Sequence, residues 1–393
     1  MRHIFYKTFA FLLFTSILCF NVLDSKSKPT KRKLDSIGSI SSSIVSSQHL
    51  PKTPNSPSFE VFKSEKIKTI PNGRFAALSQ DGSTLAAVFG NRRSPSVQVR
   101  NLKTNTIIQT IPNATAPILS QDGTTLAAGV YDKATNTFSV QVWNLKTNKL
   151  IKTITNSVWI WPVLSQDGTT LAATVDNSVQ VWNLKTNKLI KTIPNIIWPV
   201  LSNDGSTLIA QLGNSAQAWN LKTNKLIKTI PNGSFAALSN DGSTLVVQLG
   251  NSAQVWNLKT KTLIKTIYNA NGHSLSQDGS KLAVVGKWGS SSVQVWNLKT
   301  KTQVLIKRIK NAVWPALSQD GSTLAVELYD ESSRKRSVQV WNLKTNKPIK
   351  TIPNACFGNY YAVLSHDGST LAVEWYSKNK KTYSVKVFNL KTK

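Results

Sequence analysis

The segment VQVWNLKTNKLIKTIPN occupies residues 179–195, and nearly the same letters return as VQVWNLKTNKLIKTITN from Val140 and as AQAWNLKTNKLIKTIPN from Ala216. Repetition this close, at a spacing of about 40 residues, indicates a chain built from copies of one supersecondary unit. The fold therefore depends on what one unit forms and on how the copies pack.

Two short motifs alternate along the chain, with eight copies of each. The first is Leu-Ser-x-Asp-Gly-Ser/Thr, whose aspartates are Asp81, Asp122, Asp167, Asp204, Asp241, Asp278, Asp320 and Asp367. The second is Asn-Leu-Lys-Thr, preceded in turn by Arg100, Trp143, Trp182, Trp219, Trp256, Trp296, Trp341 and Phe388.

Each unit contains four short apolar runs, for example WPVLS, TLAATV, SVQVW and KLIKTI. Their alternation and length are typical of strands, and Asp-Gly between the first two suits a tight hairpin because Gly accepts positive φ. One such sheet cannot bury both of its faces alone, so the copies must pack face to face around an axis. The sequence predicts an all-β protein, an eight-bladed β-propeller of four-stranded antiparallel blades.

The order of the runs predicts how the ring closes. The chain enters with KIKTIPN at residues 66–72, which is an outer-strand sequence, and it leaves with SVKVFNLKTK, a third strand that lacks a fourth. We expect the N-terminal outer strand to join the C-terminal blade and so to remove an open sheet edge.

Residues 59–393 resemble WD40-type propeller repeats. The Trp-Asp pair of that family is here mostly Trp-Asn, as at Trp182 and Asn183, and its Gly-His is mostly Pro-Asn, as at Pro71 and Asn72. The repeats are thus a divergent, WD40-like version that lacks the family's His. The resemblance implies a scaffold that binds partners.

The N-terminal region has a different composition. Residues 1–23 combine Arg2 and Lys7 with an apolar run, the layout of a secretory signal peptide or an uncleaved membrane anchor. Residues 24–58 are rich in Ser, Lys and Pro and predict a flexible linker. We therefore expect an exported protein, whether periplasmic, extracellular or membrane-anchored, that touches a membrane only through the N-terminal segment.

Charge and cysteine content limit the possible partners and the sources of stability. With 48 Lys+Arg against 18 Asp+Glu, the formal net charge is +30, which makes anionic polymers or surfaces natural partners. Part of this excess is the lysine of the repeat, which on an outer strand discourages edge-to-edge association. Cys19 and Cys356 cannot form a disulfide framework, so stability must come from packing.

Loop lengths separate the two faces of the predicted ring. The turn face carries the first-to-second and third-to-fourth turns, which are nearly constant, and the variable face carries the other connections. The distance from the turn aspartate to the third-strand position varies from 15 to 21 residues, and all long loops belong to contiguous blades. We call these loops the basic crescent and treat it as a candidate binding site for an anionic partner. The alternative is that its side chains are simply solvated. Its residues are Arg92, Arg93, Tyr131, Lys133, Lys287, Trp288, Arg334, Lys335, Arg336, Lys378, Lys380 and Lys381.

A second candidate site is a series of aromatic residues six positions before the turn aspartate. Ala116 and Gly272 interrupt a series that consists of Phe75, Trp161, Trp198, Phe235, Trp314 and Tyr361. On innermost strands these side chains would surround the mouth of the central channel, and the plainer interpretation is packing between blades. A two-residue Asp-Gly loop places Trp314 and Tyr361 opposite Glu327 and Glu374, and Trp198 and Phe235 opposite Gln211 and Gln248. A bulged three-residue loop shifts this register by one and removes the pairing.

The sequence offers little for catalysis. Eight of the 18 acidic residues are turn aspartates, and His273 and His366 belong to different units. Glu327 and Glu374 are the one carboxylate pair worth inspecting. A quinone-dependent propeller dehydrogenase would need a carboxylate cluster beside a vicinal disulfide. We therefore expect no catalytic residue, metal, cofactor or small-molecule substrate.

Two hypotheses remain from the sequence. In the first, the chain is a non-catalytic scaffold that binds a protein partner through the variable face. In the second, it binds an anionic polymer or surface, such as a polysaccharide, nucleic acid or acidic lipid, through the basic crescent. Binding to a polyanion should collapse with rising salt, whereas a shape-matched protein interface should persist.

Overall fold

The computed structural model describes residues 68–91, 94–157, 162–286, 291–300, 304–330, 332–333, 335–353, 355, 362–377 and 382–391. The side chains of Phe75 and of residues 196–198, 376–377 and 382–383 are not described. The predicted signal or anchor (1–23) and linker (24–58) lie outside the described residues. Within the described ranges, no helix has the length and apolar character needed to cross a membrane.

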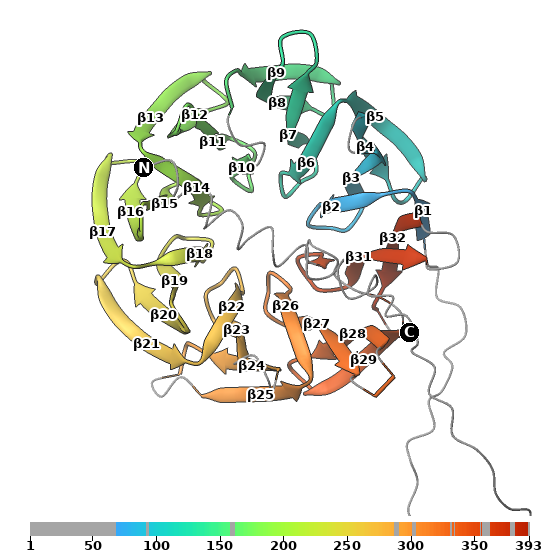
Figure 1. The fold of residues 1–393 in the computed structure, drawn as a ribbon, viewed down its shortest axis with the longest axis vertical. Helices are drawn as coiled ribbons and strands as arrows, with labels where there is room; N and C mark the ends of the chain where they lie inside the picture. Colours follow the sequence, from blue (N-terminus) through green and yellow to red (C-terminus); the bar gives the residue numbers. More distant parts are fainter. Residues whose placement is uncertain are drawn as a thin grey trace, which may run out of the picture. The chain divides into compact units, whose positions relative to one another are not determined.

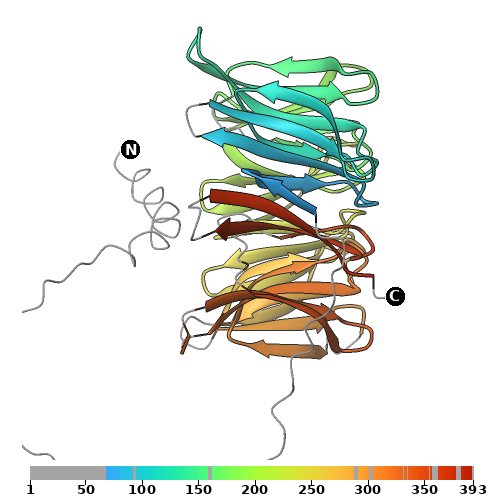
Figure 2. The same ribbon diagram turned by 90° about the vertical axis from the view of Figure 1, so that its right-hand side faces the viewer.

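Eight four-stranded antiparallel sheets are arranged around one axis as the blades of a propeller (Figure 1). The predicted fold class, an eight-bladed β-propeller, is confirmed. In each blade the first strand is innermost and the fourth is outermost, and Figure 2 shows the strands running between the two faces of the ring.

The first four blades follow one another along the chain. Blade one contains β2 (Arg74–Leu78), β3 (Thr84–Asn91), β4 (Ser94–Asn101) and β5 (Thr106–Pro112). Blade two contains β6 (Ala114–Leu119), β7 (Thr125–Asp132), β8 (Thr137–Asn144) and β9 (Lys149–Ile154). Blade three contains β10 (Val163–Leu164), β11 (Thr170–Val175), β12 (Ser178–Asn183) and β13 (Lys188–Pro194). Blade four contains β14 (Ile196–Leu201), β15 (Thr207–Leu212), β16 (Ser215–Asn220) and β17 (Lys225–Pro231).

The remaining blades complete the ring. Blade five contains β18 (Ser234–Leu238), β19 (Thr244–Leu249), β20 (Ser252–Asn257) and β21 (Thr262–Tyr268). Blade six contains β22 (Ala270–Leu275), β23 (Lys281–Gly286), β24 (Ser292–Asn297) and β25 (Leu305–Lys310). Blade seven contains β26 (Ala312–Leu317), β27 (Thr323–Asp330), β28 (Lys335–Asn342) and β29 (Lys347–Pro353). Blade eight contains β30 (Val363–Leu364), β31 (Thr370–Ser377), β32 (Thr382–Asn389) and, from the start of the chain, β1 (Lys68–Pro71).

The hydrophobic core lies between blades rather than within them. The second strand of blade three, β11, is buried at every residue, because both faces of its sheet are covered by a neighbour. Val179 and Val181 of that blade pack with Leu208 of blade four in one of eight interblade clusters. Outer strands bury few residues, as the exposed start of β13 shows. Each blade therefore depends on both neighbours.

The Asp-Gly motif builds the same hydrogen-bonded turn in each blade. In blade one, Asp81 accepts bonds from the Ser79 hydroxyl at 2.8 Å and from the Ser83 N–H at 3.0 Å. The turn glycine has positive φ and also lies against the preceding blade. A Cβ on Gly168 would come within 2.7 Å of the Thr125 hydroxyl oxygen. Glycine is therefore required here by backbone conformation and by close approach.

A closed series of backbone hydrogen bonds links these turns around the axis. The N–H of Gln80 donates to the carbonyl of Gln121 at 2.8 Å, and the N–H of His366 in blade eight donates back to the carbonyl of Gln80 at 3.1 Å. The donors of the full series are Gln80, Gln121, Gln166, Asp204, Asn240, Gln277, Asp320 and His366. Because the series returns to its start, the backbone itself joins all eight blades into one ring.

The ring is also closed at its rim by the N-terminal strand. β1 pairs antiparallel with β32, in a register that runs from Lys68 opposite Val387 to Pro71 opposite Ser384. This pairing gives blade eight the outer strand that its own segment lacks. The predicted closure is confirmed.

Lysine and tryptophan side chains connect the outer parts of neighbouring blades. The Lys191 ammonium of β13 lies 4.2 Å from the ring centroid of Trp219 on the third strand of the next blade. Equivalent contacts join Lys152 to Trp182, Lys228 to Trp256, Lys265 to Trp296 and Lys307 to Trp341, at 3.6 to 4.6 Å. This lysine of the repeat therefore packs on the next blade as a cation–π partner.

The junction between blades one and two lacks this contact. Gln109 pairs with Val99 just as Lys152 pairs with Val142, so Gln109 stands at the lysine position. The Gln109 amide oxygen and the Trp143 indole N–H are buried, and in the described part of the chain neither has a hydrogen-bond partner. Among the tryptophan-bearing junctions of the described chain, the other five all have the cation–π contact that this one lacks.

We expect Gln109→Lys to stabilise the ring by about 0.5–1 kcal/mol, because it supplies a cation over Trp143. The reverse change at an intact junction, Lys228→Gln, should destabilise the ring by a similar amount. Thermal unfolding followed by circular dichroism measures both. A lower melting temperature for Gln109→Lys would contradict the prediction.

Candidate functional site

Longer hairpins rise on the variable face of one part of the ring. The second and third strands have eight residues each in blades seven, eight, one and two, whereas those of blades three to six have six. These four blades are contiguous because β1 closes the ring. The variable face is thus raised over half of its circumference, and it also receives the start of every innermost strand.

A β-bulge interrupts the innermost strand close to the variable face. In blade seven, Val313 pairs with Glu327 and Ala316 with Ala325, so Trp314 and Pro315 together oppose the single residue Val326. Blades one, two, four, five and six show the same register shift. The predicted aromatic series falls on this bulge.

The bulge holds its residue in the left-handed backbone region. The φ angle is 43° at Phe235, 50° at Trp314, 49° at Ala116 and 71° at Gly272. A bulky side chain at positive φ costs about 1–3 kcal/mol. Elsewhere this chain avoids that cost, since 14 of the 19 described non-glycine residues with positive φ are asparagine.

Phe235 and Trp314 are also among the most exposed aromatic side chains that the structure describes. Their exposed fractions are 63% and 43%. The interpretation as packing between blades is therefore wrong for Phe235, and most of its ring lies in solvent. Trp161 and Tyr361 lie outside the described residues, as do the side chains of Phe75 and Trp198.

The bulge changes the predicted cross-strand pairs. Glu327 lies opposite Val313 rather than Trp314, and the blade five equivalent, Gln248, lies opposite Ser234 rather than Phe235. The register near the turn is that of a two-residue loop, because Leu317 pairs with Leu324. The prediction that Trp314 faces Glu327 is thus wrong, because the extra residue lies inside the strand and not at the turn.

The buried Glu327 and the half-buried Glu374 each have an arginine of their own. Glu327, whose side chain is 2% exposed, accepts a bond from the Arg336 guanidinium at 2.8 Å within blade seven. Burial raises the pKa of Glu374 in blade eight to about 7, and the positive charge of Arg74 in blade one opposes this rise. Glu327 and Glu374 are therefore separate groups: Glu327 interacts with Arg336, and Glu374 with Arg74.

The crescent residues that the structure describes fall into two kinds. Lys133 and Lys335 are exposed, and the half-buried Tyr131 donates a hydrogen bond to Asn136 at 2.5 Å. Arg336 forms an ion pair with the buried Glu327, so its charge is already compensated within the blade. Arg92, Arg93, Lys287, Trp288, Arg334, Lys378, Lys380 and Lys381 lie outside the described residues.

The turn face has a polar pocket that was not predicted from the sequence. The variable position of Leu-Ser-x-Asp-Gly carries an amide in seven blades and His366 in the eighth. A pocket of about 330 Å³ is lined there by Gln121, Gln166, Asp167, Asn203, Asp204, Asn240 and Asp241. The amide side chain that recurs at the variable position of Leu-Ser-x-Asp-Gly is the sequence feature from which this pocket could have been predicted.

Asp278 and His273 each keep a single protonation state near neutral pH. Partial burial raises the pKa of Asp278, but hydrogen bonds from Ser280, Ser276 and Lys299 outweigh it and leave this pKa at about 2. Burial lowers the pKa of His273 to about 4. Among the described residues, no group of three His, Cys, Asp or Glu is arranged to hold a metal ion.

Comparison with known proteins supports the fold and goes no further. The sequence matches no protein-family model and no curated protein. A total of 1312 chains in solved structures resemble this fold, so the fold alone does not select a function. By its architecture the chain is an eight-bladed β-propeller.

One similar structure is described as the crystal structure of the eukaryotic initiation factor. It has a TM-score of 0.59 and 15% sequence identity, and the match covers 85% of this chain and 88% of that one. At this identity the likeness concerns the fold. The resemblance of the repeats to the WD40 type stays a prediction from the sequence.

Substitution of Phe235 by glycine tests whether the left-handed backbone at this residue is strained. We expect Phe235→Gly to raise the free energy of unfolding by roughly 0.5–1 kcal/mol, because the release of left-handed strain exceeds the added chain entropy of glycine. Chemical denaturation measures this difference. A loss of stability greater than about 1 kcal/mol would mean that the Phe235 ring packs into the fold.

The raised pKa of Glu374 can be tested through the pH dependence of stability. The folded protein holds the proton of Glu374 up to pH about 7, whereas the unfolded chain releases it near the ordinary pKa of a glutamate, 4.5. Stability should therefore fall as pH rises through this window, by roughly 3 kcal/mol from this group, and level off above it. In Glu374→Gln this fall should be absent. A stability difference between the two proteins that stays constant from pH 4 to 8 would contradict the prediction.

Proposed function

We propose that this chain is a non-catalytic scaffold of WD40-like type, exported or tethered to a membrane, that binds a protein partner on its variable face. The observation that carries the proposal is the pair of exposed rings, Phe235 and Trp314, held on bulges where asparagine or glycine would be less strained. Strain of this kind is retained where a site needs it. Rigid aromatic side chains are also the usual anchors of protein interfaces.

The chemistry of the described acidic groups supports a binding role over catalysis. The turn aspartates are occupied by the hydroxyl and N–H groups of their own turns, as at Asp81. Glu327 is neutralised by Arg336, and Glu374 lies in the interior beside the charge of Arg74. We accordingly propose no cofactor and no small-molecule substrate.

A shape-matched partner also fits the variable face better than a polyanion does. Arg336, one of the crescent cations, is directed to Glu327 and contributes less charge to solvent than the sequence suggests. The exposed bulge residues Phe235 and Trp314 are uncharged and aromatic. An interface built on such groups should survive high salt, whereas contacts made by loop lysines should not.

Site-specific photo-crosslinking tests the proposal. A benzoylphenylalanine placed at Phe235 should crosslink to a discrete protein in native extract, with similar yield in low and high salt. The same probe at Leu226, which is 43% exposed on the outer strand β17, should not capture that protein. Equal capture from both positions would contradict the assignment of the partner to the variable face.

A double variant adds a functional measure. Phe235→Gly with Trp314→Gly should keep the propeller's circular dichroism spectrum and lower affinity for the captured partner at least ten-fold, as expected for two aromatic anchors. The matched control is Leu189→Ala with Leu226→Ala, two exposed apolar residues on outer strands. Unchanged affinity in the glycine variant would refute these residues as anchors.

A further inference from the structure

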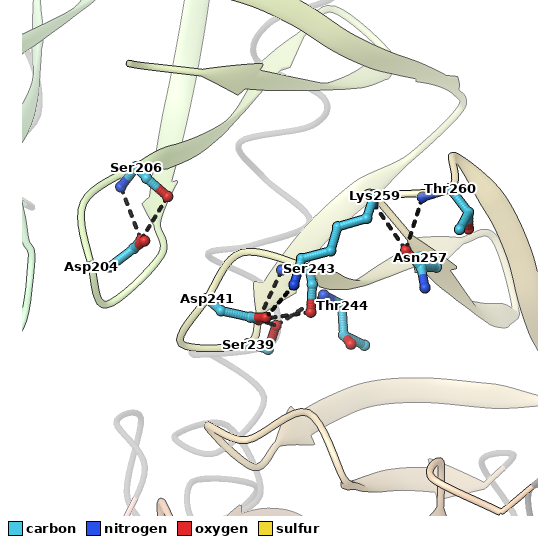
Figure 3. Close-up of polar contacts among 9 residues, drawn as sticks. All are labelled: Asp204, Ser206, Ser239, Asp241, Ser243, Thr244, Asn257, Lys259 and Thr260. Atoms are coloured by element: carbon cyan, nitrogen blue, oxygen red, sulfur yellow. Dashed lines mark hydrogen bonds and ion pairs between the residues drawn. The ribbon is translucent and has the colours of Figure 1, made fainter. Parts of the chain in front are cut away.

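Every third-to-fourth turn presents lysine on the turn face. The turn is fixed by its asparagine, as where Asn257 Oδ1 accepts the N–H groups of Lys259 at 2.9 Å and Thr260 at 3.1 Å (Figure 3). The exposed lysines of these turns and of the adjoining start of the outer strands are Lys103, Lys146, Lys149, Lys185, Lys188, Lys222, Lys225, Lys259, Lys261, Lys299, Lys344, Lys347 and Lys391. We call this set the basic annulus.

The basic annulus keeps a positive excess after its local ion pairs are counted. Its thirteen lysines stand against the eight turn aspartates. Four of them, Lys103, Lys259, Lys299 and Lys391, pair with an aspartate at 3.1 to 3.8 Å, yet their side chains remain 66% to 76% exposed. Exposed pairs of this kind are weak and readily exchange for another anion.

The lysines that stack on tryptophan are a separate set. Lys152 and Lys191 occupy the middle of the outer strands and contact the next blade. The lysines of the basic annulus lie at the ends of the turns instead, where no such packing role is seen in the described contacts. The repeat thus divides its lysines between a structural position and a solvent-facing one.

Exposed aliphatic side chains accompany the basic annulus. The second residue of an outer strand lies next to the turn, and it is 45% exposed at Leu150, Leu189 and Leu263. Ile107 and Leu226 occupy the same position, with exposed fractions of 50% and 43%. The rim of the turn face therefore alternates cationic and aliphatic groups.

The geometry of the turn face suits a flat partner. Most blades use the same turn sequence, Asn-Leu-Lys-Thr followed by two residues, and the same asparagine cap. Because equal turns on equivalent blades end at equal height, their lysines lie near one plane around the ring. A linear polymer would cross only an arc of such an annulus, whereas a planar surface meets all of it.

The chain also joins the ring on this side. β32 runs toward the turn face, and β1 is antiparallel to it, so Lys68 enters the ring at the turn face and Lys391 leaves there. The sequence predicts a signal or membrane anchor before this point. The described chain thus begins and ends at the face that carries the basic annulus.

We propose that the basic annulus docks the turn face flat on an anionic lipid membrane, a role separate from the partner binding proposed for the variable face. Lysines supply attraction to acidic headgroups, and the aliphatic side chains beside them enter the interface between headgroups and acyl chains. This pairing favours lipid over nucleic acid or acidic polysaccharide, for which the aliphatic groups have no use.

Lysine footprinting of the full-length protein tests the orientation directly. Acetylation is measured by mass spectrometry with vesicles of phosphatidylcholine alone or with 30% phosphatidylglycerol. The anionic vesicles should protect Lys146, Lys185 and Lys222 at least three-fold, and leave Lys133, Lys310 and Lys335, which are exposed elsewhere, unchanged. Because an N-terminal anchor would also insert into the neutral vesicles, the difference between the two vesicle types does not arise from it. Equal protection of both sets would overturn the proposal.

Matched variants test the energetics. The triple change Lys146→Gln, Lys185→Gln and Lys222→Gln should weaken binding to anionic vesicles on the order of 100-fold, or roughly five-fold per lysine. The control, Lys133→Gln, Lys310→Gln and Lys335→Gln, removes the same charge and should change binding less than two-fold. Partner capture at residue 235 should survive in both, so failure of one proposal is distinguishable from failure of the other.

A third variant separates lipid from polyanion. Leu150→Ser, Leu189→Ser and Leu226→Ser should weaken vesicle binding several-fold and leave retention on heparin unchanged. If this variant binds vesicles as well as the wild type does while the lysine variant loses heparin, the partner is a polyanion and the membrane assignment is wrong. An equal loss in the lysine variant and its control would refute the basic annulus itself.

Discussion

Burial of the second strand on both of its faces is the constraint on which this structure depends. A strand such as β11 has no solvated face, so its blade has no independent core and is stable only between two others. Because all eight blades share this requirement, the array must close. Backbone bonds from turn to turn do so near the axis, and β1 does so at the rim.

This constraint also determines where the sequence is free to vary. Positions that face a neighbouring blade are held to small and branched apolar residues, and the turns are held by their hydrogen bonds. The longer hairpins are found on the variable face, where the connections differ in length from blade to blade. The two faces consequently differ in kind: the turn face repeats one pattern of lysine and aliphatic side chains, and the variable face carries strained aromatic residues.

The sequence was sufficient for the architecture because each blade repeats the same signals. Eight Asp-Gly turns and an unpaired outer strand at residues 66–72 determine the number of blades and the closure. The bulge at Trp314 was not predictable, since it adds a residue within a strand whose turn and apolar pattern remain regular. Likewise, stacking of Lys191 on Trp219 joins residues of different blades, so the periodic sequence shows both groups but not their contact.

The sequence indicated the two unusual glutamates but not the inward contact of Arg336. Glu327 and Glu374 stood out as rare carboxylates, but Arg336 was grouped with the loop cations because its position on the long β27–β28 hairpin gave no sign of an inward contact. Such side-chain direction depends on which face of the strand meets a neighbour. The crescent prediction rested on loop lengths and so identified a region better than it identified the charges available in that region.

The closing strand has a consequence for how the protein is made. β1 is among the first segments of the propeller to be synthesised, yet its partner β32 is the last, more than 300 residues later. The ribosome therefore releases seven blades before the two ends can meet, and until then the growing array has an exposed sheet face at each end. The ring therefore cannot close until β32 has been synthesised, and a nascent chain stalled before β32 is prone to self-association.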